Sequence, residues 1–202
     1  MRYALALLAA LSTASGVAFA CPTASDMATG GVWVQTDDGG LIHYRRGGSD
    51  VIYERAIYPD EDDVETRTLH GVYFLQDATL KNGDIAPGTV TRYDYSDTAA
   101  LPHPDSKGNW TGDITAHVAG EAKPSSERMS VTRGDTVETT IGGCTYPARI
   151  IITMLTFPDG GTWTTQFNYL SDLGIALFAA AGKTPFSYEE FYRSVSISAT
   201  RP

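Results

Sequence analysis

The chain has 202 residues, 42% of them hydrophobic, and a formal net charge of −9 at pH 7. A chain of this length can form one domain with a sizeable core. The acidic balance argues against nucleic acid and anionic lipid surfaces as partners, because both repel a negatively charged protein.

The first twenty residues have the layout of a secretory signal peptide. A positive charge at Arg2 precedes an apolar run over residues 4–11, and a small-x-small pattern ends at Ala20. That run is shorter than the ~20 apolar residues of a membrane-spanning helix, and no later run reaches that length. We therefore expect a signal peptide over 1–20, one β domain over 21–202 exported to the periplasm or the extracellular space, and no transmembrane span.

Two cysteines, Cys21 and Cys144, remain after the expected cleavage. An even number of cysteines in an oxidising compartment favours a disulfide, which would tie the new N-terminus to the later half of the chain. The alternative is a lipid anchor on Cys21, which directly follows the cleavage position. Against it, Ala18 and Phe19 stand where lipoprotein signals usually carry Leu and a small residue.

From Gly31 onward the sequence indicates one β-strand after another. Alternation with a period of two is clearest between Trp110 and Val118, and Asp-Gly or Asn-Gly pairs separate several of the runs. The predicted strands cover residues 32–36, 41–46, 51–58, 69–77, 89–96, 110–118, 126–132, 136–141, 148–157, 162–170 and 195–199. Long loops are predicted over 59–67 and 99–109, and a turn over 133–135.

The strongest hairpin prediction joins residues 148–157 to 162–170 through Pro158-Asp159-Gly160-Gly161. Its second strand places three aromatic side chains on one face, which predicts that this face is apolar and buried or lines a cavity. These candidate binding residues are Trp163, Phe167 and Tyr169. A short helix of about two turns is predicted from Ser187, where Ser-x-x-Glu has the form of a capping box.

These elements predict a mainly β fold with a single antiparallel domain of about ten strands. The sheet would be a curved sheet or half-barrel, a barrel, or a sandwich, with at most one or two short helices.

The sequence contains no motif that assigns a catalytic role to a residue. Serine-nucleophile and phosphate-loop motifs are lacking, and the four histidines, His43, His70, His103 and His117, are scattered along the sequence. Residues 60–63 are all acidic, which suggests either a calcium site or, more simply, a solvated loop. No catalytic residue, metal ligand or cofactor is therefore predicted.

Tyrosines supply a further signal, because a buried tyrosine needs a partner for its hydroxyl and favours half-wet surfaces and cavity mouths. Eight of them fall in or beside predicted strands: Tyr44, Tyr53, Tyr58, Tyr73, Tyr93, Tyr95, Tyr146 and Tyr169. They fit ordinary sheet packing, and they also fit a concave face or cavity for a partly apolar ligand.

The C-terminal third resembles a set of exported bacterial β proteins whose curved sheet is similar to that of the periplasmic lipoprotein-localisation carriers. The matching segments are 143–146, 150–157, and Tyr169 followed by 173–177, which lie within a stretch of about 35 residues. The resemblance implies a concave apolar face for an acyl chain or peptide, and a bend of the sheet at Leu173-Gly174-Ile175. The carriers have a long helix that plugs the sheet, whereas only a short helix is predicted here.

The sequence thus favours an exported, non-catalytic β protein that binds a lipid or other amphipathic small molecule, or an envelope protein. The first alternative is a secreted hydrolase whose acidic and histidine residues come from loops. A carboxylate within hydrogen-bond reach of His43, His70 or His117 in a cleft would favour that alternative. The second alternative is a structural module of the envelope, which would have a filled core and no cleft.

Overall fold

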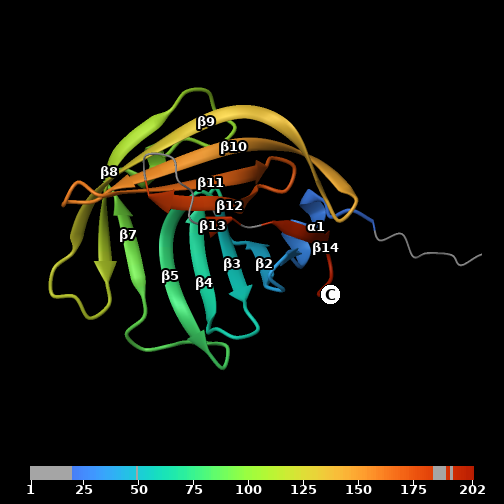
Figure 1. Ribbon diagram of the computed structural model, residues 1–202, viewed down its shortest axis with the longest axis horizontal. Coiled ribbons are helices and arrows are strands. Elements are labelled where there is room, and N and C mark those ends of the chain that lie inside the picture. The colour runs from blue at the N-terminus through green and yellow to red at the C-terminus, as the bar shows by residue number, and fades with distance from the viewer. Residues whose placement is uncertain (1–19, 49, 184–189, 192) are drawn as a thin grey trace, which may run out of the picture.

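The computed structural model describes residues 20–48, 50–183, 190–191 and 193–202, and these form one antiparallel sheet with one short α-helix (Figure 1). The elements are α1 Ala24–Thr29, β1 Val32–Thr36, β2 Leu41–Arg46, β3 Val51–Ile57, β4 Asp63–Leu69, β5 Tyr73–Lys81, β6 Asp84–Ile85, β7 Thr91–Tyr95, the 3-10 turn η1 Thr98–Ala100, β8 Trp110–Val118, β9 Ser125–Ile141, β10 Cys144–Thr156, β11 Thr162–Leu170, β12 Ile175–Lys183, β13 Glu190–Phe191 and β14 Ser194–Ser198. The predicted fold class is confirmed. The predicted strand count is low, because the described residues form 14 strands.

The sheet curls until it is nearly closed into a barrel. Its strands are ordered β13-β12-β11-β10-β9-β8-β7-β5-β4-β3-β2-β1-β14, and β6 pairs with β5. The two edge strands, β13 and β14, are consecutive in the sequence. At the turn between β9 and β10, a Cβ on Gly142 would lie 3.0 Å from the Cα of Ser196 in β14. Figure 1 shows the long strands β9 and β10 arching over the shorter strands β2 to β5.

The first hairpin shows how the sequence sets strand register. Val34 in β1 lies opposite Ile42 in β2, and both side chains are buried. In the turn between them, the Asp38 carboxylate accepts a hydrogen bond from the backbone N–H of Gly40 at 3.0 Å, and Gly39 has a φ of +89°. Because glycine adopts a positive φ without strain, this predicted hairpin is confirmed at the predicted residues.

The predicted long loop over 59–67 is wrong, because most of it belongs to β4. The inward positions of β4 hold Thr66 and Thr68, which are buried. The outward positions hold Glu65 and Arg67, whose side chains form an ion pair at 3.1 Å. A strand with threonines inside and charges outside lacks the apolar alternation by which half-buried strands are recognised.

The predicted turn over 133–135 is also wrong. The segments 126–132 and 136–141 are parts of one 17-residue strand, β9, which continues past a β-bulge in its pairing with β10. Gly134 lies against Ile150, where an added Cβ would be 3.3 Å from the Ile150 Cβ. The glycine therefore marks a bulge with close backbone approach rather than a change of chain direction.

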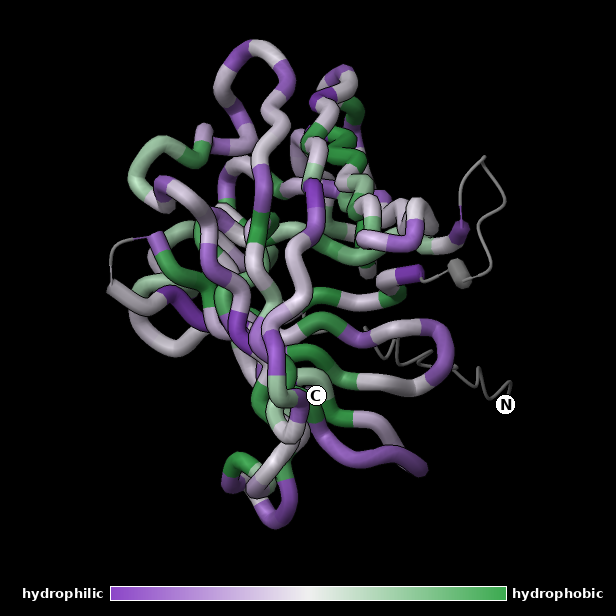
Figure 2. Tube along the Cα trace, turned by 90° about the vertical axis from the view of Figure 1, so that its left-hand side faces the viewer, coloured by the Kyte–Doolittle hydropathy of each residue, from purple (hydrophilic) through white to green (hydrophobic). Residues whose placement is uncertain are grey.

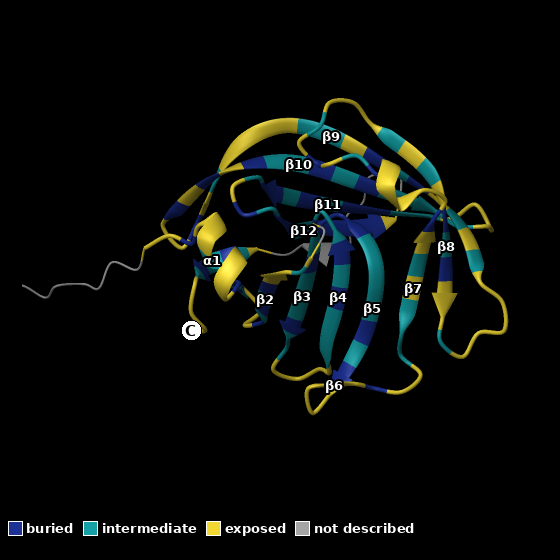
Figure 3. Ribbon diagram, turned by 180° about the vertical axis from the view of Figure 1, so that it is seen from behind, coloured by how far each residue is buried: buried dark blue, intermediate teal, exposed yellow. Residues whose placement is uncertain are grey.

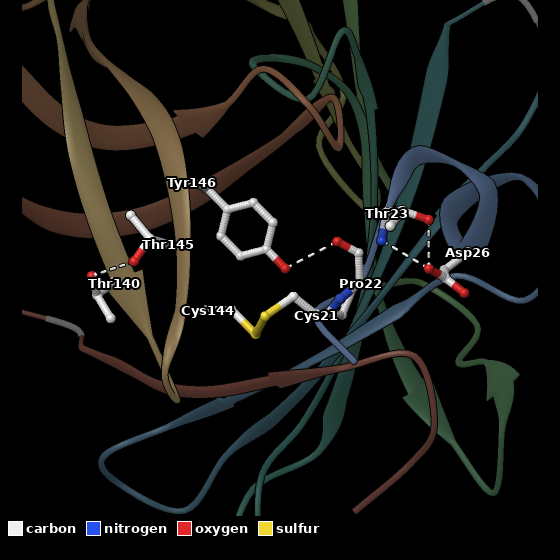
Figure 4. The surroundings of a disulfide bond; sticks show 8 residues. All are labelled: Cys21, Pro22, Thr23, Asp26, Thr140, Cys144, Thr145 and Tyr146. Carbon is white, nitrogen blue, oxygen red and sulfur yellow. Dashed lines mark hydrogen bonds between the residues drawn. A yellow bond between two sulfur atoms is a disulfide. The ribbon is translucent and has the colours of Figure 1, made fainter. Parts of the chain in front are cut away.

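A disulfide between Cys21 and Cys144 joins the N-terminal segment to the start of β10, as predicted (Figure 4). The two Cα atoms are 5.5 Å apart and 123 residues apart in the sequence. Beside it, the Tyr146 hydroxyl donates a hydrogen bond to the backbone oxygen of Pro22 at 3.0 Å. The Cys21 sulfur is thus bonded to a second cysteine, and the disulfide points to an oxidising compartment outside the cytosol.

The helix α1 was not predicted, although the sequence carries a signal for it. The Asp26 carboxylate accepts hydrogen bonds at 2.8 Å from both the backbone N–H and the hydroxyl of Thr23, which closes the first turn (Figure 4). Met27 is buried and attaches the helix to the core. Within the part of the chain that the structure describes, no helix has the length and apolar character needed to cross a membrane.

The C-terminal predictions have mixed outcomes. The short helix predicted from Ser187 lies largely outside the described residues, and the two described residues that follow, Glu190–Phe191, form β13. The bend expected at 173–175 is instead the turn between β11 and β12. There the N–H groups of Leu173 and Gly174 both donate to the Leu170 oxygen, and Gly174 has a φ of +70°.

Buried side chains form two clusters inside the sheet. Strands β1 to β3, together with α1 and parts of β10 to β12, supply the first cluster, and β5, β7, β8 and the middle of β9 to β11 supply most of the second. Figure 2 shows the hydrophobic residues along the strands and hydrophilic residues at several loop tips. Figure 3 shows long exposed stretches on β9, whereas β3 to β5 are mostly buried or intermediate. The interior between these strands contains the candidate site.

Candidate functional site

Two neighbouring cavities of about 230 and 210 Å³ lie where the two clusters of buried side chains meet. Residues of the second cluster line the larger one, here called the first cavity, and residues of the first cluster line the smaller one, the second cavity. Phe178 of β12 lines both and stands between them. Five aromatic residues line the first cavity: Phe74, Tyr93, Tyr95, Trp163 and Phe178.

A row of polar side chains crosses four neighbouring strands beneath these cavities. Tyr44 of β2 lies opposite Glu54 of β3, Glu54 opposite Thr66 of β4, and Thr66 opposite Asp77 of β5. Directly opposed residues of antiparallel strands point to the same face of a sheet, so all four side chains face the interior. Asp77 lines the first cavity, and Glu54 and Tyr44 line the second.

Asp77 is held by hydrogen bonds. The Tyr93 hydroxyl donates to its Oδ2 at 3.0 Å, and the Thr66 hydroxyl also donates to its carboxylate. Burial raises the pKa of Asp77 above its ordinary value, and both hydrogen bonds oppose that rise. Burial and the adjacent carboxylate raise the pKa of Tyr93 in turn, so its hydroxyl stays protonated and remains a donor.

Glu54 has a different environment. Burial, followed by the negative charge of Asp77, raises its pKa to about 8. No described residue forms a hydrogen bond with its carboxyl group, although the side chain remains half-buried and therefore within reach of solvent in the second cavity. Two hydrogen bonds therefore stabilise the charged form of Asp77, whereas the pKa of Glu54 carries no such hydrogen-bond contribution.

The aromatic wall of the first cavity is fixed by ring contacts. Phe74 packs against Tyr93 and Phe167, with ring centroids 6.2 and 6.4 Å apart. Phe167 in turn meets Phe178 edge to face at 5.8 Å. Such contacts between rings add to the free energy of burial. The wall is therefore a packed surface rather than a set of separate side chains.

The three candidate binding residues have different positions. Trp163 is half-buried and lines the first cavity. Phe167 is buried and supports Phe74 and Phe178. Tyr169 is buried further along β11, where its hydroxyl lies 3.3 Å from the Nε2 of His103. Of the three, Trp163 alone is among the described residues that line this cavity.

The sequence reasoning missed Glu54, Asp77 and Thr66. Glu54 and Asp77 fall in predicted strands, but their common face depends on the intervening strand β4, which was predicted as a loop. The sequence gives no clear signal for this strand, because β4 alternates threonine with charged residues rather than apolar with polar ones.

Neither His43 nor His117 meets a carboxylate in a cleft, whereas His70 and His103 line a pocket that Asp50 also lines. His117 pairs with Asp94 at 3.0 Å, but both side chains are largely exposed and neither lines a described cavity. His43 stacks on Trp33 with centroids 4.1 Å apart. This arrangement gives no support to the hydrolase alternative from His43 or His117.

His70 and His103 meet in a small polar pocket of about 80 Å³ between the loop after η1 and the turn at the end of β11. Their ring centroids are 5.0 Å apart. Burial, followed by the neighbouring His103, lowers the pKa of His70, which favours its neutral form. The Ser171 hydroxyl donates to Asp105 at 2.7 Å on the same side of the molecule. These contacts attach the loop to β11.

The acidic run of residues 60–63 forms ion pairs at the rim of the sheet. Asp63 pairs with Arg55 at 2.8 Å, and Asp62 lies 3.9 Å from Lys81. Within the described ranges there is no group of three or more His, Cys, Asp or Glu side chains placed to hold a metal ion. The calcium reading gains no support from this geometry.

Comparison with known proteins shows no family. No family model matches the chain, and no curated protein matches it. Among solved structures, the chain is similar to the hypothetical lipoprotein YmcC from Escherichia coli K12, with 12% sequence identity and a TM-score of 0.47. The match covers 82% of this chain and 87% of that chain. The expected resemblance to the lipoprotein-localisation carriers therefore stays a prediction.

Proposed function

We propose that this protein is an exported, non-catalytic binding protein that holds a small apolar or amphipathic molecule in the two cavities beside Phe178. The observation that carries the proposal is the interior space walled by aromatic side chains and bordered by the polar row of Tyr44, Glu54, Thr66 and Asp77. Binding sites for small molecules are mostly apolar and contain a few placed polar groups.

The sizes of the cavities limit the ligand. Each is smaller than the ~300 to 1,000 Å³ typical of ligand sites, but the two together fall within that range. Phe178 lines both, so a ligand that occupies the two cavities would contact this side chain. The ligand is therefore a short apolar chain or a single ring system with one polar end, rather than a large lipid.

The disulfide supports the expected compartment. The Cys21–Cys144 bond would be reduced in a typical cytosol and is stable in an oxidising one. Export of the chain would place the cavities where envelope or extracellular small molecules could enter them.

Displacement of an apolar naphthylamine dye by octanol tests this function. The dye should fluoresce on binding, and octanol should displace it. Thr153→Leu, which adds apolar volume to the wall of the first cavity, should weaken dye binding by about tenfold, equivalent to ~1.4 kcal/mol. Thr132→Leu makes the same change at an exposed position of β9 and should bind as the parent does.

Two results would contradict the proposal. One is a purified, folded protein that takes up neither the dye nor octanol. The other is equal weakening by Thr153→Leu and Thr132→Leu, which would place the dye on the surface rather than in the cavity.

A further inference from the structure

The two cavities hold acids without a neighbouring base. Glu54 and Asp77 line them, and none of the described lining residues of either cavity is Lys, Arg or His. Electrostatic interaction between the two carboxyl groups is repulsive. The interior therefore holds two carboxyl groups, and no described side chain of its walls is a base that could pair with them.

The side chains around this acid pair are neutral. Tyr44 from β2, Tyr58 after β3, Thr66 from β4 and Tyr93 from β7 approach it, and each contributes a hydroxyl group. The pKa of Tyr44 is raised well above its ordinary value by burial and by Glu54, so this hydroxyl is protonated too. A cation entering the cavities would meet oxygen atoms and aromatic faces.

The arginines of the same strands point to the outer face of the sheet. Arg55 is adjacent to Glu54 in β3 and so points to the opposite face, where it binds Asp63 at 2.8 Å. Arg67 of β4 likewise binds Glu65 at 3.1 Å. Both guanidinium groups are thus engaged with carboxylates outside the cavity.

Two further basic residues lie near the mouths of the cavities. Lys183, the cross-strand partner of Trp163, is exposed at the end of β12. Arg193 is exposed and lines a separate hollow that also borders Phe178. Neither lines the two cavities, so an anionic ligand could pair with them only by leaving its polar end outside.

We infer that the cavities bind a cationic amphiphile, a molecule with an ammonium group and a short apolar portion, and that the ammonium lies between Glu54 and Asp77. Asp77 lines the first cavity and Glu54 the second, and their strands are two sheet spacings apart, about 10 Å, so an ammonium group at the junction of the two cavities could interact with both carboxyl groups. The apolar portion would lie against the aromatic wall of the first cavity. This inference rests on the proposed function and adds the class of the ligand.

Three physical effects favour a cation there. A carboxyl group taken out of water without a partner is costly, and a ligand cation would supply that partner. Aromatic faces attract ammonium groups through their π electrons, and Tyr93, Tyr95 and Phe74 line the adjacent wall. A carboxylate or phosphate head group would meet the repulsion of Asp77 in a medium that screens charge poorly.

The test compares three ligands that share an eight-carbon chain: octyltrimethylammonium, octanol and octanoate. Short chains suit a first cavity of about 230 Å³. Dye displacement is measured at one ionic strength on the full chain, with folding of each variant checked by circular dichroism. Octyltrimethylammonium should bind at least about tenfold more tightly than octanol, ~1.4 kcal/mol, and octanoate should bind most weakly.

Variants of the two acidic residues test whether they cause the preference for the cation. Asp77→Asn and the Glu54→Gln, Asp77→Asn double variant should lose the preference for the cation, measured as the ratio of the octyltrimethylammonium and octanol affinities of the same variant. Asp135→Asn removes the same charge from an exposed site on β9 and should keep the preference. If Asp77→Asn does not fold, the preference for the cation is measured on Glu54→Gln instead.

The outcomes separate the two proposals. Equal binding of all three ligands, tightest binding of octanoate, or a cation preference that survives the double variant would overturn the inference and leave the binding function standing. Failure of all three ligands and the dye to bind would overturn both.

Discussion

Tyr93 donates a hydrogen bond to Asp77 from the neighbouring strand, with its hydroxyl oxygen 3.0 Å from Oδ2. Asp77 lies opposite Thr91 in the β5–β7 pair, so Tyr93 is its diagonal neighbour on the same face. The bond fixes the position of a carboxylate in a cavity that is otherwise largely apolar. It also opposes the rise that burial causes in the pKa of Asp77.

Removal of that donor should destabilise the protein. Tyr93→Phe leaves the Asp77 carboxylate with one fewer hydrogen bond, which should lower the free energy of unfolding at pH 7 by about 1 to 3 kcal/mol. Tyr53→Phe is the matched control, because the ring of Tyr53 stacks with Arg67 on the outer face, and should change stability by less than ~0.5 kcal/mol. If urea denaturation shows the same loss of unfolding free energy for Tyr93→Phe and Tyr53→Phe, the hydrogen bond to Asp77 contributes nothing to stability.

The raised pKa of Glu54 predicts a pH dependence of stability. The folded protein holds this proton up to a pKa of about 8, whereas the unfolded chain releases it near the ordinary value of 4.5. Between these values the folded state binds more protons, so the Glu54 contribution to stability falls as the pH rises through this window. The free energy of unfolding can change through this group by at most ~1.4 kcal/mol per pH unit, and solvent in the cavity reduces that change.

Urea denaturation of the parent and of Glu54→Gln at several pH values measures this contribution. Glutamine does not titrate, so the variant should gain stability over the parent as the pH rises from about 5 to 8. Other groups, including His43 and His70 with their lowered pKa values, are common to both proteins and cancel in the difference. A difference that stays constant across this range would contradict the prediction.

The parts of the fold that the sequence predicts well are those with local signals. The hairpin at Asp37–Gly40 follows from Asp-Gly, and the burial of Phe167 and Tyr169 on β11 follows from alternation. A disulfide between the two cysteines follows from their even number and the expected compartment. Each of these inferences needs only a few neighbouring residues or a count.

The candidate site could not be found in this way, because it depends on register between strands. Glu54, Thr66 and Asp77 come from three strands. Taken alone, each of these residues looks like any polar residue of a half-buried strand. A shift of one residue in any pairing would turn its side chain to the outer face. The β-bulge beside Gly134 has only a glycine as its sequence signal, and the register shifts between Arg67 and Thr68 and between Gln166 and Phe167 lack even that.

Loss of the disulfide should be the largest single change in stability. The Cys21–Cys144 bond closes a loop across 123 residues, which corresponds to roughly 4 to 5 kcal/mol in the chain-entropy model. The Cys21→Ser, Cys144→Ser double variant should lose about that amount of unfolding free energy. Tyr146→Phe, which removes the adjacent hydrogen bond to Pro22, should lose about 1 kcal/mol. Two free thiols in mass spectrometry of the non-reduced protein would contradict the bond itself.

Arg133 should contribute more to stability than any exposed ion pair. Its guanidinium donates to the oxygens of Gly108, Tyr73 and Pro102 at 2.7, 3.0 and 3.1 Å, which attaches the loop before β8 to the sheet. Arg133→Ala should therefore cost at least ~2 kcal/mol, because two part-buried acceptors, the Tyr73 hydroxyl and the Pro102 oxygen, lose a charged donor together with the exposed oxygen of Gly108. Arg128→Ala breaks only an exposed pair with an aspartate on β8 and should cost less than ~0.5 kcal/mol. Similar losses for the two variants in thermal and urea denaturation would show that the loop is held by other contacts.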